Sequence, residues 1–329
     1  MKGGSKMKKS KVVMTGRLMA PALDRIQEVC EVRAWEKVDP IPRENLFEWL
    51  KDAEGLVVTG NIQVDEELLQ HAPSLKVIVQ SAVGYDNINI EACTRRGILF
   101  GNTPGVLVDA TADLAFSLLL CSARRIHEGW ESVRTGSWHS GCKIPFGIDL
   151  AGKTLGIVGM GQIGVAVAKR AKAFGMKIIY YNRNRRSNDN EIGAIYESFH
   201  GLLEQSDYVI VLTPLSKETR GLFGREQFKK MKSTAYFINV SRGPVVDTDA
   251  LLDALRTGEI AYAALDVTDP EPLLGDHPLL TLPNILITPH IGSATIETRT
   301  AMAQLTADNL LAGLSGEPLP ACVNANEVK

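Results

Sequence analysis

The segment Gly159–Gly164, with the sequence GMGQIG, constrains the fold of this chain more than any other. It matches the pattern G-x-G-x-x-G and stands between a strand-like run, Thr154–Val158, and a helical pattern, Gly164–Phe174. In this context the first glycine permits a tight turn, the second lets a pyrophosphate approach the backbone, and the third lets the helix pack on the strand. The loop therefore predicts a dinucleotide-binding unit; a glycine-rich turn without a ligand is the alternative.

Two series of short apolar runs alternate with helical patterns along the 329 residues of the chain. Continuous apolar runs are typical of parallel strands that are covered on both faces. The expected strands are Lys11–Gly16, Gly55–Gly60, Val77–Gln80 and Ile98–Phe100, and then Thr154–Val158, Lys177–Asn182, Tyr208–Leu212, Ala235–Val240, Ala261–Val267 and Ile285–Thr288. This alternation predicts an α/β fold with two doubly wound parallel sheets.

Helical spacing completes the expected organisation. It predicts helices at Asp65–His71 and Ile90–Arg96, one long helix near Val106–Val133, and a last helix near Thr298–Leu314. A lone helix at the end of the chain needs a sheet to cover, so we expect it to return to the first domain. The expected parts are a disordered leader at 1–10, a first domain at 11–103 and 295–329, and a dinucleotide-binding domain at 104–294.

The composition argues against several other classes of protein. With 36 Lys and Arg against 38 Asp and Glu the net charge is −2, so nothing indicates nucleic acid or an anionic membrane as a partner. No apolar run approaches the ~18 residues of a membrane span. The basic start lacks the apolar run of a signal peptide, and the five cysteines form no CxxC pair. We therefore expect a cytoplasmic protein without disulfides or a metal site.

The residue at the end of the second strand of a dinucleotide-binding unit distinguishes NAD from NADP. An acidic side chain there hydrogen-bonds the ribose 2′-OH. Here Asn182 takes that place, and the basic residues Arg183, Arg185 and Arg186 follow. Guanidinium groups bind a phosphate through charge-assisted hydrogen bonds. The sequence therefore predicts NADP(H), with NAD(H) as the alternative, and Arg183 as the first candidate for the 2′-phosphate contact; a basic turn that meets only solvent is the other interpretation.

Arg242, Glu271 and His290 each lie shortly after the end of a predicted strand. The carboxyl ends of parallel strands line the ligand crevice of such a sheet. All three side chains can therefore converge on a nicotinamide that the same sheet holds. Each of them taken alone is as readily a surface or structural residue. Together, and after a dinucleotide loop, they predict a catalytic group.

Several motifs occur in the order that one enzyme family shows. They are Ser81–Ile88 (SAVGYDNI), Asn102–Gly105 (NTPG), Gly159–Gly164, Asn239–Gly243 (NVSRG), Asp266-Val267 with Glu271-Pro272, and Pro289–Ala294 (PHIGSA). With them the chain resembles the D-isomer-specific 2-hydroxyacid dehydrogenases over roughly Lys11 to Val323, and most of all the glyoxylate/hydroxypyruvate and 2-ketogluconate reductases. The resemblance implies a flavodoxin-like substrate domain and a Rossmann dinucleotide-binding domain, with a cleft between them.

The resemblance also implies a role for each site residue. His290 would be the general acid that protonates the carbonyl oxygen as hydride arrives, and Glu271 would pair with it so that the imidazolium persists near neutral pH. Arg242 would hold the carboxylate and keto oxygen of the substrate. Backbone N–H groups of Val83 and Gly84 would bind the substrate carboxylate. The implied cofactor contacts are Gly159, Gly161, Gln162, Ile163, Gly164, Asn182, Arg183, Arg185, Thr213, Pro214, Ser241 and Asp266.

The function that the resemblance implies is NADPH-dependent reduction of small 2-keto acids to D-2-hydroxy acids. The expected substrates are glyoxylate and hydroxypyruvate, with 2-ketogluconate as a third candidate. The segment that carries Trp130 and Trp138 joins subunits in this family, which implies a homodimer. Alternatives are an NAD-dependent dehydrogenase of 3-phosphoglycerate or another D-2-hydroxy acid, and a dinucleotide-sensing, corepressor-like binding module. Glu271 argues against formate oxidation, in which no carbonyl oxygen is protonated.

Overall fold

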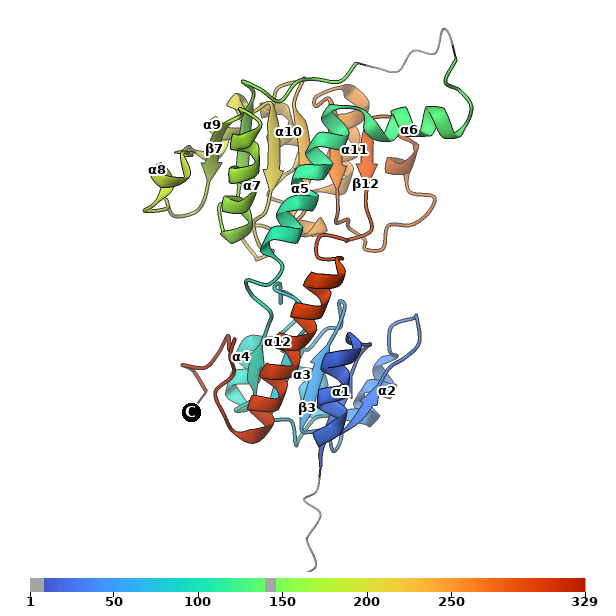
Figure 1. Ribbon diagram of the computed structural model, residues 1–329, viewed down its shortest axis with the longest axis vertical. Helices are drawn as coiled ribbons and strands as arrows, with labels where there is room; N and C mark the ends of the chain where they lie inside the picture. The colour runs from blue at the N-terminus through green and yellow to red at the C-terminus, as the bar shows by residue number, and fades with distance from the viewer. Residues whose placement is uncertain (1–8, 140–145, 329) are drawn as a thin grey trace, which may run out of the picture. The chain divides into compact units, whose positions relative to one another are not determined.

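The computed structural model describes residues 9–139 and 146–328 (Figure 1). The chain divides into two compact units: unit 1 holds the residues up to Leu107 and those from Ala294 onward, and unit 2 is Val108–Ser293. Most of the expected leader, 1–10, lies outside the described residues. Ser10, however, is already part of the first strand, where it lies opposite Cys30 in the strand alongside.

Unit 1 contains a five-stranded sheet with the order β2-β1-β3-β4-β5. Its strands are β1 (Ser10–Met14), β2 (Cys30–Ala34), β3 (Gly55–Val58), β4 (Val77–Gln80) and β5 (Leu99–Gly101), and its helices are α1 (Ala20–Val29), α2 (Arg43–Leu50), α3 (Glu66–Gln70), α4 (Ile90–Arg95) and α12 (Ile296–Ser315). Every strand pair is parallel. This order is the flavodoxin-like one.

Helices cover both faces of this sheet, which is why β3 and β4 are buried along their whole length. On one face α1 and α12 lie side by side (Figure 1) and pack their apolar residues on β1, β3 and β4. On the other face α2, α3 and α4 supply the core. The last helix thus joins a sheet whose strands come from the other end of the chain.

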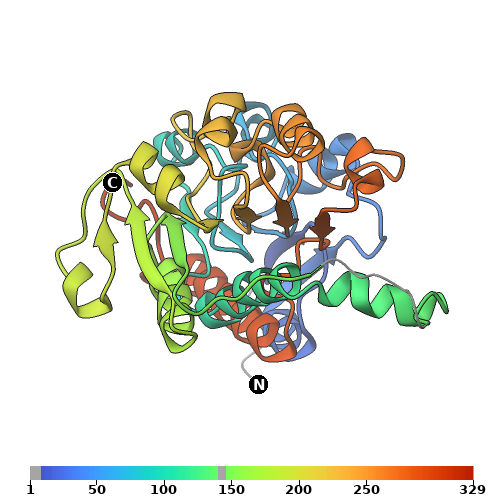
Figure 2. The same cartoon turned by 90° about the horizontal axis from the view of Figure 1, so that it is seen from above.

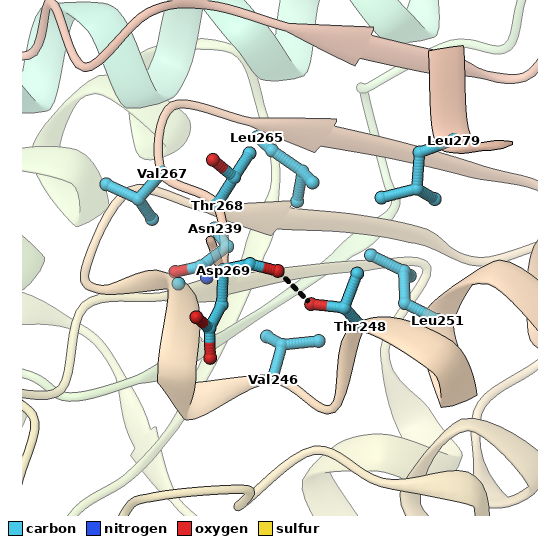
Figure 3. A pocket seen from close by; sticks show the side chains of 10 residues that line it. Asn239, Val246, Thr248, Leu251, Leu265, Val267, Thr268, Asp269 and Leu279 are labelled. Carbon is cyan, nitrogen blue, oxygen red and sulfur yellow. Dashed lines mark hydrogen bonds between the residues drawn. The ribbon is translucent and has the colours of Figure 1, made fainter. Parts of the chain in front are cut away.

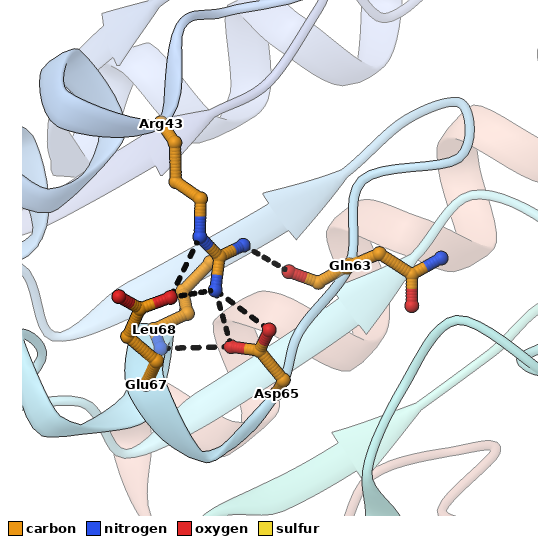
Figure 4. Close-up of polar contacts among 5 residues, drawn as sticks. All are labelled: Arg43, Gln63, Asp65, Glu67 and Leu68. Atoms are coloured by element: carbon orange, nitrogen blue, oxygen red, sulfur yellow. Dashed lines mark hydrogen bonds and ion pairs between the residues drawn. The ribbon is translucent and has the colours of Figure 1, made fainter.

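The N-terminus of α3 is fixed by a cap and by an arginine from α2 (Figure 4). Asp65 accepts a hydrogen bond from the backbone N–H of Leu68 at 2.9 Å. Nη2 of Arg43 lies 2.6 Å from Oδ2 of Asp65 and 2.9 Å from Oε2 of Glu67, and Nη1 donates to the carbonyl of Gln63. Because Arg43 begins α2, these contacts tie α2 to α3 on the same face of the sheet.

Unit 2 contains a seven-stranded sheet with the order β12-β11-β10-β9-β6-β7-β8. The strands are β6 (Thr154–Val158), β7 (Lys177–Tyr181), β8 (Ile195–Tyr196), β9 (Tyr208–Val211), β10 (Tyr236–Asn239), β11 (Tyr262–Leu265) and β12 (Ile285–Ile287). All of its strand pairs are parallel. This is the Rossmann order with one added strand, and the direction of winding reverses between β6 and β9.

The helices of unit 2 cover the two faces of that sheet. They are α5 (Val108–Ala123), α6 (Ile126–Arg134), α7 (Gln162–Ala173), α8 (Asp189–Ile192), α9 (Phe199–Gln205), α10 (Arg225–Lys230) and α11 (Thr248–Thr257), with short 3-10 turns at Gly243–Val245 and Pro278–Thr281. α5 and α7 pack together on one face, and α9, α10 and α11 cover the other. None of the described helices is both long and apolar enough to cross a bilayer.

The single long helix expected at Val106–Val133 is wrong. The chain breaks between α5 and α6 at Arg125, which has a left-handed backbone with φ 54°. The Arg125 guanidinium lies 4.7 Å from the ring centre of Tyr262 and bonds Glu128 at 2.9 Å. These contacts fix Arg125 at the bend, so α6 takes a new direction and extends beyond β12, the edge strand (Figure 1, Figure 2).

Candidate active site

The glycine loop after β6 has two glycines that the fold requires and one that it does not. Gly159 has φ +102°, and a Cβ on it would lie 2.6 Å from the backbone nitrogen of Thr213. A Cβ on Gly164 would lie 2.6 Å from the carbonyl oxygen of Gly159. A Cβ on Gly161 would meet no atom of the described residues within 4 Å. The space beside Gly161 therefore suits the close approach of a ligand, as a dinucleotide pyrophosphate requires.

The first turn of α7 faces this loop with unpaired donors. Gly161 is the N-cap of α7, and no side chain among the described residues caps the helix there. The first N–H groups of a helix, here those of Gln162 and Ile163, have no carbonyl partner within the helix. Together with the helix dipole they form a site for an anion. These residues fit the phosphates of a dinucleotide.

Asn182, which stands where an acidic residue would bind the ribose, contacts the glycine loop itself. Its Oδ1 accepts a hydrogen bond from the backbone N–H of Met160 at 2.6 Å. Arg186 reaches the same residue, since its Nη1 donates to the carbonyl of Met160 at 2.9 Å. Arg183 and Arg185 are exposed. The sequence did not single out Arg186 as a residue that supports the loop.

The turn that carries Arg242 is held by the last residue of β10. Asn239, which is 1% exposed, accepts hydrogen bonds from the backbone N–H and the hydroxyl of Ser241 at 3.0 and 2.8 Å. Its Nδ2 donates to the carbonyl of Arg242 at 3.1 Å. Ser241, expected to contact the cofactor through its backbone, thus already uses its N–H within the turn. Three hydrogen bonds from one buried amide fix the direction in which Arg242 leaves the sheet.

Glu271 and His290 come together from the loops after β11 and β12. Oε1 of Glu271 lies 2.6 Å from Nδ1 of His290, and Oε2 accepts from the backbone N–H of Thr268 at 3.4 Å. Burial alone would raise the pKa of the Glu271 carboxyl. The hydrogen bond and charge of His290, the Thr268 N–H and the charge of Arg242 outweigh burial and lower that pKa. Glu271 is therefore an anion at neutral pH and pairs with the imidazole ring.

The turn around His290 is held by Asp266, which follows β11 and is 2% exposed. Oδ1 of Asp266 accepts from the Ile291 N–H at 2.8 Å and the Thr288 hydroxyl at 2.7 Å, and Oδ2 accepts from the Gly292 N–H at 2.8 Å. His290 itself has φ 54°, an uncommon conformation for a residue with a side chain. Asp266, expected beside the nicotinamide carboxamide, thus has both oxygens engaged in shaping the His290 turn.

The backbone of the Arg242 turn packs directly on the loop that carries Glu271. A Cβ on Gly243 would lie 1.9 Å from the carbonyl oxygen of Thr268, so only glycine permits this approach. Thr248 donates to the carbonyl of Asp269 at 2.9 Å (Figure 3). Between the two loops lies a cavity of about 10 Å³, lined mostly by apolar side chains of β11, α11 and the following turns. This packing sets the position of Arg242 relative to Glu271.

The remaining expected site residues lie at other strand ends. Thr213 and Pro214 follow β9, and the Thr213 backbone borders Gly159. Val83 and Gly84 lie in unit 1, in the loop after β4. Within unit 2, the catalytic candidates Arg242, Glu271 and His290 follow β10, β11 and β12, which are neighbours in the sheet. The structure therefore brings these three together on the same sheet that carries the dinucleotide loop.

Comparison with known proteins agrees with this geometry. Residues 116–292 match the model of the D-isomer specific 2-hydroxyacid dehydrogenase, NAD binding domain. The chain belongs to the D-isomer-specific 2-hydroxyacid dehydrogenase family. It is therefore an oxidoreductase whose unit 2 carries the dinucleotide-binding domain of that family.

Relatives within this family match over almost the whole chain. A glyoxylate reductase of Thermococcus litoralis is 49% identical over 96% of this chain and 97% of its own length, and one of Pyrococcus furiosus is 46% identical over 98% and 97%. An NADPH-dependent glyoxylate/hydroxypyruvate reductase of Sinorhizobium meliloti, solved with NADP and malonate, is 32% identical with a TM-score of 0.88, covering 98% of each chain. The order of the strands in both units thus has solved counterparts in this family.

Proposed function

We propose that this dehydrogenase reduces glyoxylate and hydroxypyruvate to the corresponding 2-hydroxy acids with NADPH, with the D configuration where the product is chiral. The observation that carries the proposal is the contact between Glu271 and His290 on the sheet that also holds Arg242 and the dinucleotide loop. Relatives at 46% and 49% identity are named glyoxylate reductases, which supports a small 2-keto acid as the substrate. In this proposal His290 is the acid, Glu271 is the anion that pairs with it, and Arg242 is the cation. Reduction of a negatively charged keto acid needs a proton donor for the carbonyl oxygen and a positive charge that binds the carboxylate.

The reaction adds a hydride to the keto carbon and a proton to its oxygen. When bound, the reduced nicotinamide supplies the hydride. Because Nδ1 of His290 faces Glu271, Nε2 is the nitrogen that gives the proton to the developing alkoxide. Glu271 accepts the hydrogen bond from Nδ1 and offsets the positive charge that His290 carries before the transfer. The product leaves as a 2-hydroxy acid, and the imidazole regains its proton from water.

Arg242 binds the carboxylate and keto oxygen of the substrate in this proposal. A planar guanidinium matches two oxygens at once, and its charge polarises the carbonyl for attack. The hydrogen bonds that Asn239 donates to the Arg242 carbonyl and accepts from the Ser241 N–H hold the Arg242 turn in one position before the substrate arrives. The backbone N–H groups of Val83 and Gly84 bind the other oxygen of the carboxylate.

NADPH is the preferred cofactor in this proposal, because Asn182 lacks the charge that would repel a 2′-phosphate and Arg183 follows it. The solved NADP complex of a relative supports a family site that accepts this cofactor. In Arg183→Ala we expect the KM for NADPH to rise about tenfold or more while the KM for NADH stays within twofold, since a charge-assisted hydrogen bond is lost. Arg256→Ala, an exposed arginine in the last turn of α11, is the control.

A homodimer completes the proposal. One face of α6 carries Ile126, Trp130 and Val133, spaced by four and three residues, and these side chains are 52%, 62% and 57% exposed. Large apolar side chains that gather on one helix face mark an interaction surface. We assign this face to a second copy of the chain.

The decisive experiment is a substrate panel with the purified protein. Oxidation of NADPH and NADH is followed with glyoxylate, hydroxypyruvate and 2-ketogluconate, and with 3-phosphohydroxypyruvate as the acceptor of the alternative function. We expect the highest kcat/KM with glyoxylate or hydroxypyruvate and NADPH. Turnover only with 3-phosphohydroxypyruvate, or with none of the four acids, rejects the proposal.

A further inference from the structure

The loop after β4 has three consecutive carbonyl groups that all bond to unit 1 itself. The carbonyl of Ala82 accepts from the backbone N–H of Thr103 at 3.0 Å. The carbonyl of Val83 accepts from Nδ2 of Asn102 at 2.9 Å, and that of Gly84 accepts from Nε2 of Gln80 at 2.8 Å. In a trans peptide unit the N–H points opposite to the C=O. The N–H groups of Val83, Gly84 and Tyr85 therefore all turn away from these partners.

These three N–H groups donate no hydrogen bond to any of the described residues. Successive N–H groups that point outward form a concave site for an anion. A loop of this kind needs its carbonyls to be held, because each peptide unit can otherwise rotate and present its carbonyl oxygen to the anion. The anion site therefore depends on the side chains of Gln80 and Asn102, which hold two of the carbonyls, as well as on the N–H groups themselves.

Both of those side chains are buried amides with their own fixed surroundings. Gln80 is 4% exposed and bonds the amide of Asn87, which is 7% exposed and donates in turn to the carbonyl of Ile62 at 2.7 Å. Asn102 is 7% exposed, and its backbone carbonyl accepts from Nδ2 of Asn309 in α12 at 3.0 Å. Burying an amide costs free energy unless its hydrogen bonds are made. The hydrogen bonds of Gln80 and Asn102 therefore fix the orientation of both residues.

We infer that Gln80 and Asn102 are positioning residues for the substrate carboxylate: they hold the loop 82–85 so that its N–H groups bind that anion. This inference rests on the proposed function, which assigns the carboxylate to Val83 and Gly84. Neither amide touches the substrate. Each acts by keeping a peptide dipole preorganised, which favours binding because no reorientation is needed when the anion arrives.

Two substitutions remove these donors and nearly keep the shape of the side chain. Gln80→Met loses the donor to the Gly84 carbonyl together with the two hydrogen bonds that Gln80 makes with Asn87, and Asn102→Leu loses the donor to the Val83 carbonyl without adding a charge. In each variant we expect the KM for glyoxylate to rise about tenfold, as the loss of one ordered anion contact implies. The KM for NADPH stays within twofold, and kcat at saturating glyoxylate changes less than the KM. The inhibition constant of oxalate, a carboxylate that cannot be reduced, rises by the same factor.

The control is Asn324→Leu, which removes another buried amide of unit 1; this amide bonds Phe100, Ile98 and Thr94 and makes no hydrogen bond to residues 82–85. It should lower the unfolding temperature without changing the KM for glyoxylate. A wild-type KM and wild-type oxalate inhibition in folded Gln80→Met or Asn102→Leu overturns the inference, and so does an equal rise of KM in Asn324→Leu. If Gln80→Met does not fold, Asn102→Leu decides alone. Failure of the proposed function is a separate result, because it shows as absent turnover in the wild-type protein.

Discussion

His290 and Glu271 lie 19 residues apart in the sequence, yet Nδ1 of the histidine is 2.6 Å from Oε1 of the carboxylate. The two side chains are 41% and 26% exposed, so the pair is open to a ligand while its partners remain fixed. Asp266 holds the turn of the histidine, and Thr268 donates to the carboxylate. The orientation of the ring is therefore set by the protein before any substrate binds.

The activity should depend on the charge of Glu271. In Glu271→Gln we expect kcat to fall about 10²-fold, because a neutral amide does not support the protonated ring; His290→Gln should lose about 10²–10⁴-fold. Steady-state kinetics with glyoxylate measures both. Asp269→Asn is the matched control, since it neutralises an acid two residues away that bonds the described residues through its backbone carbonyl and not through its carboxylate. A wild-type kcat in Glu271→Gln would rule out the role of Glu271 as the partner that supports His290 in proton transfer.

The stability should depend on pH through the same carboxylate. The folded pKa of Glu271 is lowered, whereas the unfolded value is near 4.3. Its stabilising contribution is thus fully present above the unfolded value and is lost as the pH falls through the folded value. We expect the difference in unfolding free energy between wild type and Glu271→Gln to be present at pH 6 and to shrink below about pH 4. Urea titrations at each pH measure it; a difference that grows on acidification contradicts the assignment.

The two glycines Gly159 and Gly161 should respond differently to the same substitution. Gly159→Ala places a Cβ 2.6 Å from Thr213 at a positive φ, so we expect a loss of about 3 kcal/mol of stability. The Cβ of Gly161→Ala lies within 4 Å of none of the atoms that the structure describes, so the unfolding temperature should stay unchanged while NADPH binds about tenfold or more weakly. Thermal unfolding and a fluorescence titration with NADPH separate the two effects. Equal NADPH affinity in Gly161→Ala and wild type would speak against a cofactor at this loop.

The exposed face of α6 should hold two subunits together. We expect Trp130→Glu to yield monomers in light scattering, because a charge would be buried in an apolar contact. Ile195→Glu replaces a side chain of similar exposure, 67%, on the edge strand β8 and should leave the dimer intact. A wild-type protein that is monomeric at micromolar concentration contradicts this part of the proposal.

The strands that the sequence predicted are those with continuous apolar runs, such as β3 and β4. A strand that is buried on both faces has apolar residues at successive positions, and this run is easily recognised in a sequence. β2 was missed because CEVRA alternates apolar and charged residues at a sheet edge, where one face of the strand stays exposed. The bend at Arg125 carries neither glycine nor proline, so no local signal marks it. It depends on Tyr262 and Glu128, and one of these lies far along the chain.

The candidate site was predictable in kind but not in detail. Strand ends and motifs pointed to Arg242, Glu271 and His290, whereas the distances between their loops depend on tertiary packing such as that of Gly243 on Thr268. The supporting residues Gln80, Asn239 and Asp266 share one signal that sequence reasoning left unused. Each is a buried polar residue at or directly after the end of a continuous apolar strand. Such a residue has to bond something in the loop that follows.

The placement of α12 has a consequence for biosynthesis. The chain completes five strands of unit 1, makes the whole of Val108–Ser293, and only then supplies the helix that covers β3 and β4. On the ribosome, unit 2 is contiguous and can form as soon as it emerges, whereas the part of the first sheet that α12 covers stays open until residues 296–315 have been made. Of the two sheets, the one that is made first is thus the last to be covered on both faces.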